Sequence, residues 1–347
     1  MTELSEADRA LARLDAAGGE FPDPHTMVGP FIRQEAVLSS RIEGTRTTLD
    51  ELLTFEVSPT PKRGARSDAA EVESYVRALD YGIDRLGTLP ISLRLLRELH
   101  ERLMQGVRGG ELAPGEFRRS QNWIGPPGSA LDTATYVPPP VKQMHSALEQ
   151  LELYVHNASD LPPLIRIAMI HYQFEAIHPF LDGNGRIGRL LVSLLLSQWQ
   201  LLTRPFLYLS AHFEASRQEY YDRLLAVSQV NEWNGWLTYF LHGVAQQSRA
   251  ATVRISRLAE IREHYHEILQ GERAAANLSG VVEFLLGQPI VSVRQVERGI
   301  RANSYRVAQS YILKLVELGI LREVTGQSRN RLYRADEILK AIKEPLA

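Results

Sequence analysis

Apolar residues recur at helical spacing along most of the chain, and the alternation that is typical of strands is scarce. This pattern predicts helices over residues 69–85, 91–104, 141–155, 163–176 and 217–244. Glycine and proline in 18–29 predict a loop between a short N-terminal helix and a second helix, which Pro30 opens as a first-turn residue. In that second helix Ser39 and Glu43 share one face, and Gly44 is expected to end it.

Two other segments depart from helical spacing. In 115–140, two short β-type runs flank a centre rich in Gly, Pro, Ser and Asp, which predicts an exposed hairpin-like flap. After residue 277, three short helices precede two β-like runs around a turn, an order typical of a winged-helix domain. The expected ranges are 280–286, 293–300 and 304–318 for the helices, then 320–324 and 330–334 for the β-like runs. We therefore expect a mainly α fold with a β-hairpin flap and a C-terminal winged-helix domain.

Composition narrows the class of protein. The chain has 347 residues, 44% of them hydrophobic and 23% charged, which fits two or three ordinary globular domains. It has no cysteine, which excludes a disulfide scaffold, a thiolate zinc site and a cysteine nucleophile. The first residues lack the apolar core of a signal peptide, and the most apolar stretch, 190–202, is too short to span a bilayer. We expect a soluble, cytoplasmic protein that does not enter membranes.

Charge is unevenly distributed along the chain. The overall net charge is −2, yet residues 291–334 hold nine Lys and Arg against three Glu, a net charge of +6. A basic winged helix can place its third helix, with Arg306, in a DNA major groove while Arg331 lies near phosphates. Winged helices also serve as protein-docking or dimerisation modules. Duplex DNA and a protein partner therefore both remain candidates for this domain.

The most informative run is HPFLDGNGRIGR, residues 178–189. An apolar helix arrives there and must end, because Pro179 disfavours the α conformation at His178. Glycines then permit positive φ before a new helix begins near Arg186. The free N–H groups and positive dipole of that helix start form an anion site sized for phosphates, over which Arg186 and Arg189, one turn apart, can both lie.

Two further side chains supply chemistry to the same run. Asp182 is a hard oxygen ligand suited to a magnesium ion that already holds phosphate oxygens. His178 is the residue here that can accept a proton near neutral pH. Together these groups indicate phosphoryl or nucleotidyl transfer. The run is not a Walker loop, because no Gly-Lys-Ser/Thr follows.

At every defining position, this run resembles the signature of the Fic family (Fic/Doc proteins). Residues 39–44, SSRIEG, fit the inhibitory motif of that family, Ser/Thr-x-x-x-Glu-Gly/Asn. The segment 115–140 lies where the family has its target-docking flap. The resemblance covers roughly residues 1–245 and implies a Fic-type helical bundle for that part.

The resemblance implies transfer of AMP from ATP to a Ser, Thr or Tyr hydroxyl of a protein, with release of pyrophosphate. ATP is then the substrate and Mg²⁺ the metal. The implied roles are a general base for His178, a magnesium ligand for Asp182, an anion-binding turn for Gly183, Asn184 and Gly185, and phosphate contacts for Arg186 and Arg189.

The resemblance also implies that the chain inhibits itself from its N-terminal side. Glu43 would pair with Arg189 and block the seat of the γ-phosphate, since a carboxylate and a phosphate compete for the same donors. Ser39, one turn earlier, could hydrogen-bond within or beside that pair. Tyr221 is the candidate for stacking on adenine, although aromatic residues at helical spacing, such as Tyr220 and Trp236, are more typical of a core.

The expected organisation has four parts. An N-terminal helical region (1–90) carries the inhibitory helix at about 30–44, a Fic core (91–245) carries the flap and the signature, a helical linker spans 246–276, and the winged helix spans 277–347. The acceptor would be a hydroxyl of a protein target, the chain itself included, and a homodimer is a further expectation. Three alternatives stay open: a DNA-binding regulator with a nucleotide-sensing Fic domain, a different pyrophosphate-containing donor, and removal of AMP.

Overall fold

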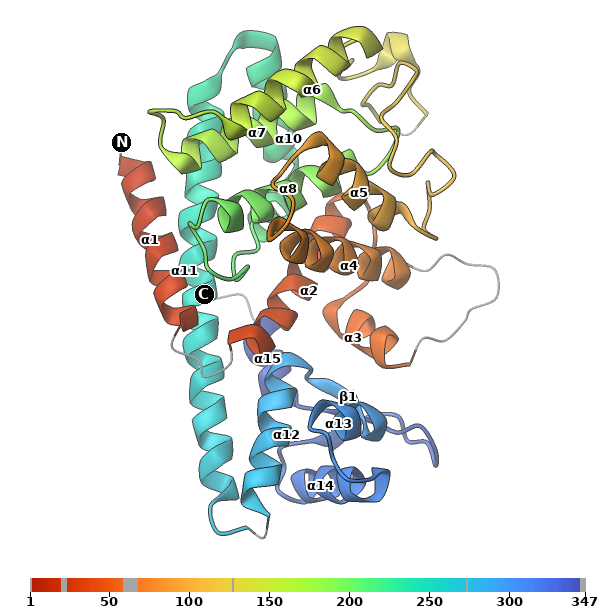
Figure 1. The fold of residues 1–347 in the computed structure, drawn as a ribbon, viewed down its shortest axis with the longest axis vertical. Helices are drawn as coiled ribbons and strands as arrows, with labels where there is room; N and C mark the ends of the chain where they lie inside the picture. The colour runs from red at the N-terminus through yellow and green to blue at the C-terminus, as the bar shows by residue number, and fades with distance from the viewer. Residues whose placement is uncertain (1, 20–23, 59–67, 127, 273, 344–347) are drawn as a thin grey trace.

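The computed structural model describes residues 2–19, 24–58, 68–126, 128–272 and 274–343. Within these ranges the chain is mainly helical, with one small antiparallel three-stranded sheet near the C-terminal end (Figure 1). None of the helices in this part of the chain combines the length and apolar character that a bilayer crossing requires.

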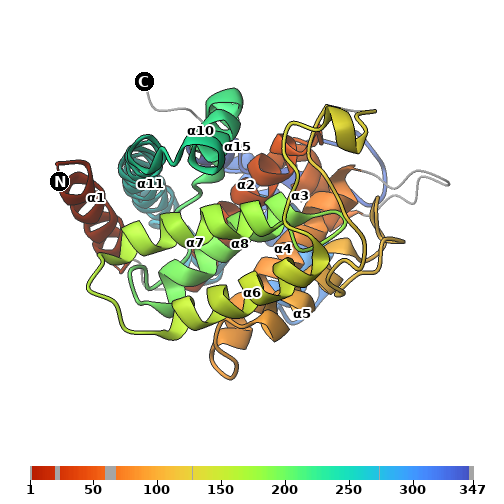
Figure 2. The same cartoon turned by 90° about the horizontal axis from the view of Figure 1, so that it is seen from above.

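The N-terminal region and the helical core supply most of the helices. The first region holds α1 (Thr2–Gly19), α2 (Pro24–Ile42), α3 (Leu49–Val57) and α4 (Asp68–Leu86). The core holds α5 (Leu93–Met104), the short 3-10 turn η1 (Leu131–Thr133), α6 (Val141–His156), α7 (Pro163–Ile177), α8 (Asn184–Gln198), α9 (Ser210–Ala215), α10 (Arg217–Val230) and α11 (Trp233–Leu269). Helices α7 and α8 lie side by side at the centre, with α6 against α7 and with α4 and α5 against α8 (Figure 2).

The C-terminal unit, residues 275–343, contains the sheet. Its elements are α12 (Ala275–Gly287), β1 (Ile290–Ser292), α13 (Val293–Gly299), α14 (Tyr305–Glu317), β2 (Arg322–Glu323), β3 (Leu332–Arg334) and α15 (Asp336–Lys343). The strand order is β1-β3-β2, with Val291 opposite Tyr333 and Arg322 opposite Arg334. This unit packs on the rest of the chain through α12 against α2, β1 against α3 and α15 against α11.

The structure corrects the expected start of the second helix. Helix α2 begins at Pro24, and Pro30 lies inside it rather than in its first turn. Proline inside a helix removes one backbone hydrogen bond. Here the longer helix buries Met27 and Phe31, each 1% exposed, which offsets that loss.

A further difference concerns a helix end. The expected helix over 217–244 is interrupted at Asn231, which takes a left-handed conformation (φ 60°) and ends α10. Helix α11 then runs unbroken through 245 and 246, the expected boundary between the core and the helical linker. It does so because α1 packs along it and covers an apolar stripe that a free linker would expose.

The segment 115–140 follows a hairpin-like path, but it is not a two-stranded hairpin. A single bridge between Ile124 and Tyr136 joins its two arms, and η1 lies between them. The backbone N–H groups of Thr135 and Tyr136 both donate to the carbonyl of Ile124. Proline residues on both arms lack the N–H groups that a longer ladder would need.

Candidate functional site

The site is built on the turn between α7 and α8, and side chains fix its shape. His178 ends α7 with φ 49°, and Gly183 precedes α8 with φ 77°. Asn184 ties the turn together, because Phe180 N donates to its Oδ1 (2.8 Å) and its Nδ2 donates to Phe180 O (2.9 Å). Phe180 is fully buried and stacks on His100, whose Nε2 donates to the carbonyl of Asp182 (3.0 Å). The turn is therefore held from both sides.

The imidazole of His178 is held in one tautomer by its surroundings. Its Nδ1 lies 3.2 Å from the carbonyl of Glu175, and a carbonyl can only accept, so Nδ1 carries the proton. Burial lowers the pKa of His178 to about 4, against an opposing effect of that hydrogen bond and of the charge on Glu43. At neutral pH the ring is thus neutral, and Nε2 keeps a lone pair for an incoming proton.

Arg186 is one of two buried arginines on the first turns of α8. It is 2% exposed, and its Nη1 donates to Glu71 of α4 at 2.7 Å. Its Nη2 lies 3.6 Å from Oδ1 of Asp182. The buried Nε of Arg186 finds no acceptor among the residues that the structure describes. This leaves one N–H donor unused beside the N-terminus of α8.

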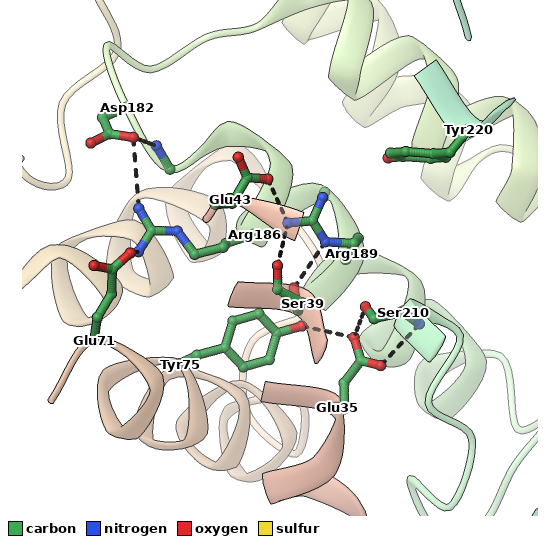
Figure 3. A network of polar contacts seen from close by, with 12 residues as sticks. Glu35, Ser39, Glu43, Glu71, Tyr75, Asp182, Arg186, Arg189, Ser210 and Tyr220 are labelled. Carbon is green, nitrogen blue, oxygen red and sulfur yellow. Dashed lines mark hydrogen bonds and ion pairs between the residues drawn. The ribbon is translucent and has the colours of Figure 1, made fainter. Parts of the chain in front are cut away.

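Arg189 is 3% exposed, and its partners are Ser39 on α2 and Glu43 just after that helix (Figure 3). Nε donates to Oγ of Ser39 (2.9 Å), and Nη2 donates both to the carbonyl of Ser39 (3.0 Å) and to Oε1 of Glu43 (2.6 Å). The structure therefore brings together the three side chains that the sequence analysis grouped as an inhibitory set.

Glu43 lies over the first turn of α8. A Cβ placed on Gly185 would come within 2.3 Å of Oε1 of Glu43, so a side chain at 185 would displace the carboxylate. Burial disfavours the charged form of Glu43, but the charge and hydrogen bond of Arg189 outweigh it and lower the pKa. The carboxylate is therefore ionised at neutral pH and competes with other anions for this helix end.

Asp182 lies at the open edge of the turn. Its side chain is 40% exposed, and its Oδ1 accepts the N–H of Gly183 at 2.6 Å. Gly109 makes room for the other oxygen, because a Cβ there would come within 2.2 Å of Oδ2. No group of three or more metal-binding side chains occurs in the described ranges. A lone accessible carboxylate fits a cation whose remaining ligands are phosphate oxygens and water.

Of the aromatic residues Tyr220, Tyr221 and Trp236, two lie in the core and one lies near the surface. Tyr220 is 1% exposed with its hydroxyl 2.8 Å from Nε2 of His171, and Trp236 is fully buried and donates to the carbonyl of Ala168 (3.0 Å). Tyr221 is 37% exposed, and burial and the charge of Glu43 raise its pKa. Of the three, Tyr221 is thus the ring that a ligand beside Glu43 could reach.

Two buried acidic residues near the two arginines, Glu71 and Glu35, were not identified from the sequence. Glu71 pairs with Arg186 across 115 positions of sequence, and no local pattern links them. Glu35, 3% exposed, accepts hydrogen bonds from the hydroxyl of Tyr75 (3.2 Å) and from N and Oγ of Ser210, and burial raises its pKa. The sequence offers one sign that Glu35 belongs to this group of residues, because it lies one helical turn before Ser39.

Comparison with known proteins places this architecture in a family. The family model described as "Fic/DOC family N-terminal" matches residues 1–84, and the model described as "Fic/DOC family" matches residues 90–196. The chain belongs to the Fic/DOC family.

The chain is similar to curated proteins named protein adenylyltransferase Fic. It is 34% identical to the one from Drosophila willistoni over 200 residues, which are 54% of this chain and 38% of that protein. It is 36% identical to the one from Drosophila virilis over 110 residues, 31% of this chain and 20% of that protein. The chain thus spans between about a fifth and two fifths of the length of these relatives.

Solved structures share the fold. A Fic family protein from Desulfovibrio desulfuricans superposes with a TM-score of 0.58 at 19% identity, covering 95% of each chain. A Fic domain containing signaling protein from Bacteroides thetaiotaomicron gives 0.56 at 16% identity, covering 72% of this chain and 97% of the other. Fic-1 from C. elegans gives 0.54 at 20% identity, covering 74% and 73%.

Proposed function

We propose that this protein is an adenylyltransferase, which transfers AMP from ATP to a Ser, Thr or Tyr hydroxyl of a protein. The observation that carries the proposal is the joint placement of a helix N-terminus, two buried arginines and a neutral histidine around one turn. The helix end and the arginines suit a polyphosphate. The histidine suits deprotonation of a hydroxyl.

In the proposed reaction, the target hydroxyl oxygen attacks the α-phosphorus while Nε2 of His178 accepts its proton. The bond from the α-phosphorus to the bridging oxygen of the β-phosphate breaks, and pyrophosphate leaves. Backbone N–H groups of 183–185, together with Arg186 and Arg189, offset the negative charge on the phosphates. Asp182 would hold Mg²⁺, which supplies further charge neutralisation when bound.

The resting arrangement is the inhibited one in this proposal. Arg189 uses two of its nitrogens on Ser39 and Glu43, so a γ-phosphate has to compete for them. Tyr221, the exposed ring on this side, would contact the adenine. The arms of 115–140 offer exposed backbone to an extended segment of the target protein.

For the C-terminal unit we propose a winged-helix domain. The strand order β1-β3-β2, with α13 and α14 between β1 and β2, supports this assignment. Arg322 and Arg334 are engaged with Asp336. Arg306, by contrast, is exposed in the first turn of α14. Duplex DNA is therefore a second candidate partner, and binding that weakens with salt and with Arg306→Ala would support it.

The test of the reaction uses ATP labelled at either end. With the Glu43→Gly variant, label from the α-phosphate should enter protein and label from the γ-phosphate should not. Label from the γ-phosphate alone would instead indicate phosphoryl transfer. Parallel reactions with the other nucleoside triphosphates and with CDP-choline identify the donor, and His178→Ala in the same background is the control that should abolish labelling.

A further inference from the structure

Helix α2 links the site to the C-terminal unit (residues 275–343). Its last turn carries Ser39 to Arg189, whereas an earlier part of the same helix packs against α12 and α15 (Figure 1). Gly29 and Ser39 are ten residues apart, which is about 15 Å along a helix. A displacement at one end of α2 is therefore transmitted to the other.

The contact between α2 and α12 is a close approach of two backbones. A Cβ placed on Gly29 would lie 3.2 Å from the carbonyl oxygen of Gly287, the last residue of α12. Met27 and Phe31 on either side are each 1% exposed. The same Cβ would lie 3.0 Å from Nη1 of Arg33, so a side chain at this position crowds both α12 and the Arg33 guanidinium.

The segment that follows Glu43 is attached to the same unit. Helix α3 begins at Leu49 and packs against β1. Asp50 on this helix accepts from Nζ of Lys343 at 3.0 Å and lies 3.9 Å from Nη1 of Arg334. The two elements that flank Glu43 in the sequence, α2 and α3, are thus both in contact with the C-terminal unit.

An ion pair also joins α2 to α3 directly. Nε of Arg33 on α2 donates to Oε2 of Glu56 on α3 at 2.7 Å, and both side chains are less than one fifth exposed. The loop with Glu43 therefore connects two helices that are joined to each other and packed on α12 and β1. Movement of the C-terminal unit would change the position of both ends of that loop.

We propose that the C-terminal unit holds Glu43 on Arg189, so that separating this unit from α2 and α3 relieves inhibition. The inference rests on the proposed inhibitory role of Glu43. The contacts of Arg189 with Ser39 and Glu43 span 2.6–3.0 Å. Hydrogen bonds of this length weaken steeply when the partners shift by an ångström. A displacement of α2 that reaches its last turn would therefore loosen these contacts and make Arg189 available to a phosphate.

The test compares two glycines in helices. Gly29→Val crowds the contact between α2 and α12, because its γ-carbons extend beyond a Cβ that already lies 3.2 Å from the Gly287 carbonyl oxygen, whereas Gly280→Val changes α12 where a Cβ would meet no atom within 4 Å. Both substitutions put the same β-branched residue into a helix, so their helix-propensity costs match. Each is measured in the wild-type chain and in Glu43→Gly. We expect Gly29→Val to raise AMP transfer at least about fivefold with Glu43 present and to have no effect in Glu43→Gly.

Asp50→Asn is the milder variant, in case Gly29→Val does not fold. It removes partly exposed ion pairs, so the rise in AMP transfer should be at most about fivefold and should again require Glu43. Gly280→Val should match wild type in both backgrounds. Wild-type transfer rates in folded Gly29→Val and Asp50→Asn would overturn the inference. So would an equal rise with and without Glu43.

A second readout separates this inference from the proposed function. If Glu43→Gly transfers no AMP, the proposed reaction fails, but the restraint on Glu43 can still be measured by amide hydrogen exchange. Exchange of residues 37–48 should be faster in Gly29→Val than in Gly280→Val. Equal exchange in these two variants would contradict the restraint whatever the reaction is.

Discussion

The ion pair between Glu71 and Arg186 provides a quantitative test of the site. Both side chains are nearly inaccessible, at 6% and 3% exposed, and the N–O distance is 2.7 Å. Glu71→Ala leaves the guanidinium of Arg186 buried without its closest carboxylate partner, while Asp182 remains 3.6 Å away. Removing one member of a buried pair costs about 3–5 kcal/mol, and we expect the lower end because Asp182 compensates in part.

The assay is thermal unfolding with and without inorganic pyrophosphate. A loss of about 3 kcal/mol lowers Tm by about 4 °C in a chain of this size. Pyrophosphate bound at the turn restores a negative charge beside Arg186, so the difference from wild type should shrink as pyrophosphate is added. Glu98→Ala is the control, because it breaks the partly buried ion pair between Arg85 of α4 and Glu98 of α5, which involves neither the turn nor α2. Its loss of Tm should not depend on pyrophosphate.

Two results would refute this reasoning. A loss of stability below about 1 kcal/mol in Glu71→Ala would mean that Arg186 does not depend on its partner. Equal effects of pyrophosphate on Glu71→Ala and Glu98→Ala would mean that the anion does not bind beside Arg186.

Three further predictions concern the reaction. Glu43→Gly removes a partly exposed charged hydrogen bond worth about 1–2 kcal/mol, so the kcat/KM for ATP should rise about 5- to 30-fold. An unchanged kcat/KM in steady-state kinetics would contradict competition between Glu43 and ATP for Arg189. Because the pKa of His178 is lowered to about 4, its base form persists as pH falls, and transfer by Glu43→Gly should stay level from pH 8 to 5.5; an ordinary histidine would lose about tenfold over that range. Asp182→Asn should raise the Mg²⁺ concentration for half-maximal transfer at least about tenfold, and an unaltered magnesium titration would exclude it as a ligand.

The local geometry of the site could be predicted because residues that are adjacent in the sequence determine it. Pro179 favours an end of the first helix at His178, and Gly183 permits the turn before the next helix; His178 and Gly183 both have positive φ. The approach of Glu43 to Arg189 was also expected, although only through the resemblance to a family. Spacing along α2 placed Ser39 and Glu43 on one face, and the structure places both against the same guanidinium.

Contacts between distant segments could not be predicted in this way. The pairing of Glu71 with Arg186 joins α4 to α8, and single-sequence patterns carry no signal for such a distance. The start of α2 was misplaced because Pro30 is tolerated where tertiary burial favours a longer helix. The continuity of α11 depends on α1 packing along it, which its own residues do not reveal.

Intact-protein mass spectrometry after incubation with ATP and magnesium tests the central proposal most directly. Wild type, Glu43→Gly and Glu43→Gly/His178→Ala are compared, each alone and with cell lysate. The account predicts an AMP-sized addition to a protein that grows in Glu43→Gly and disappears when His178 is also replaced. No addition in Glu43→Gly, with ATP binding intact by calorimetry, would contradict it.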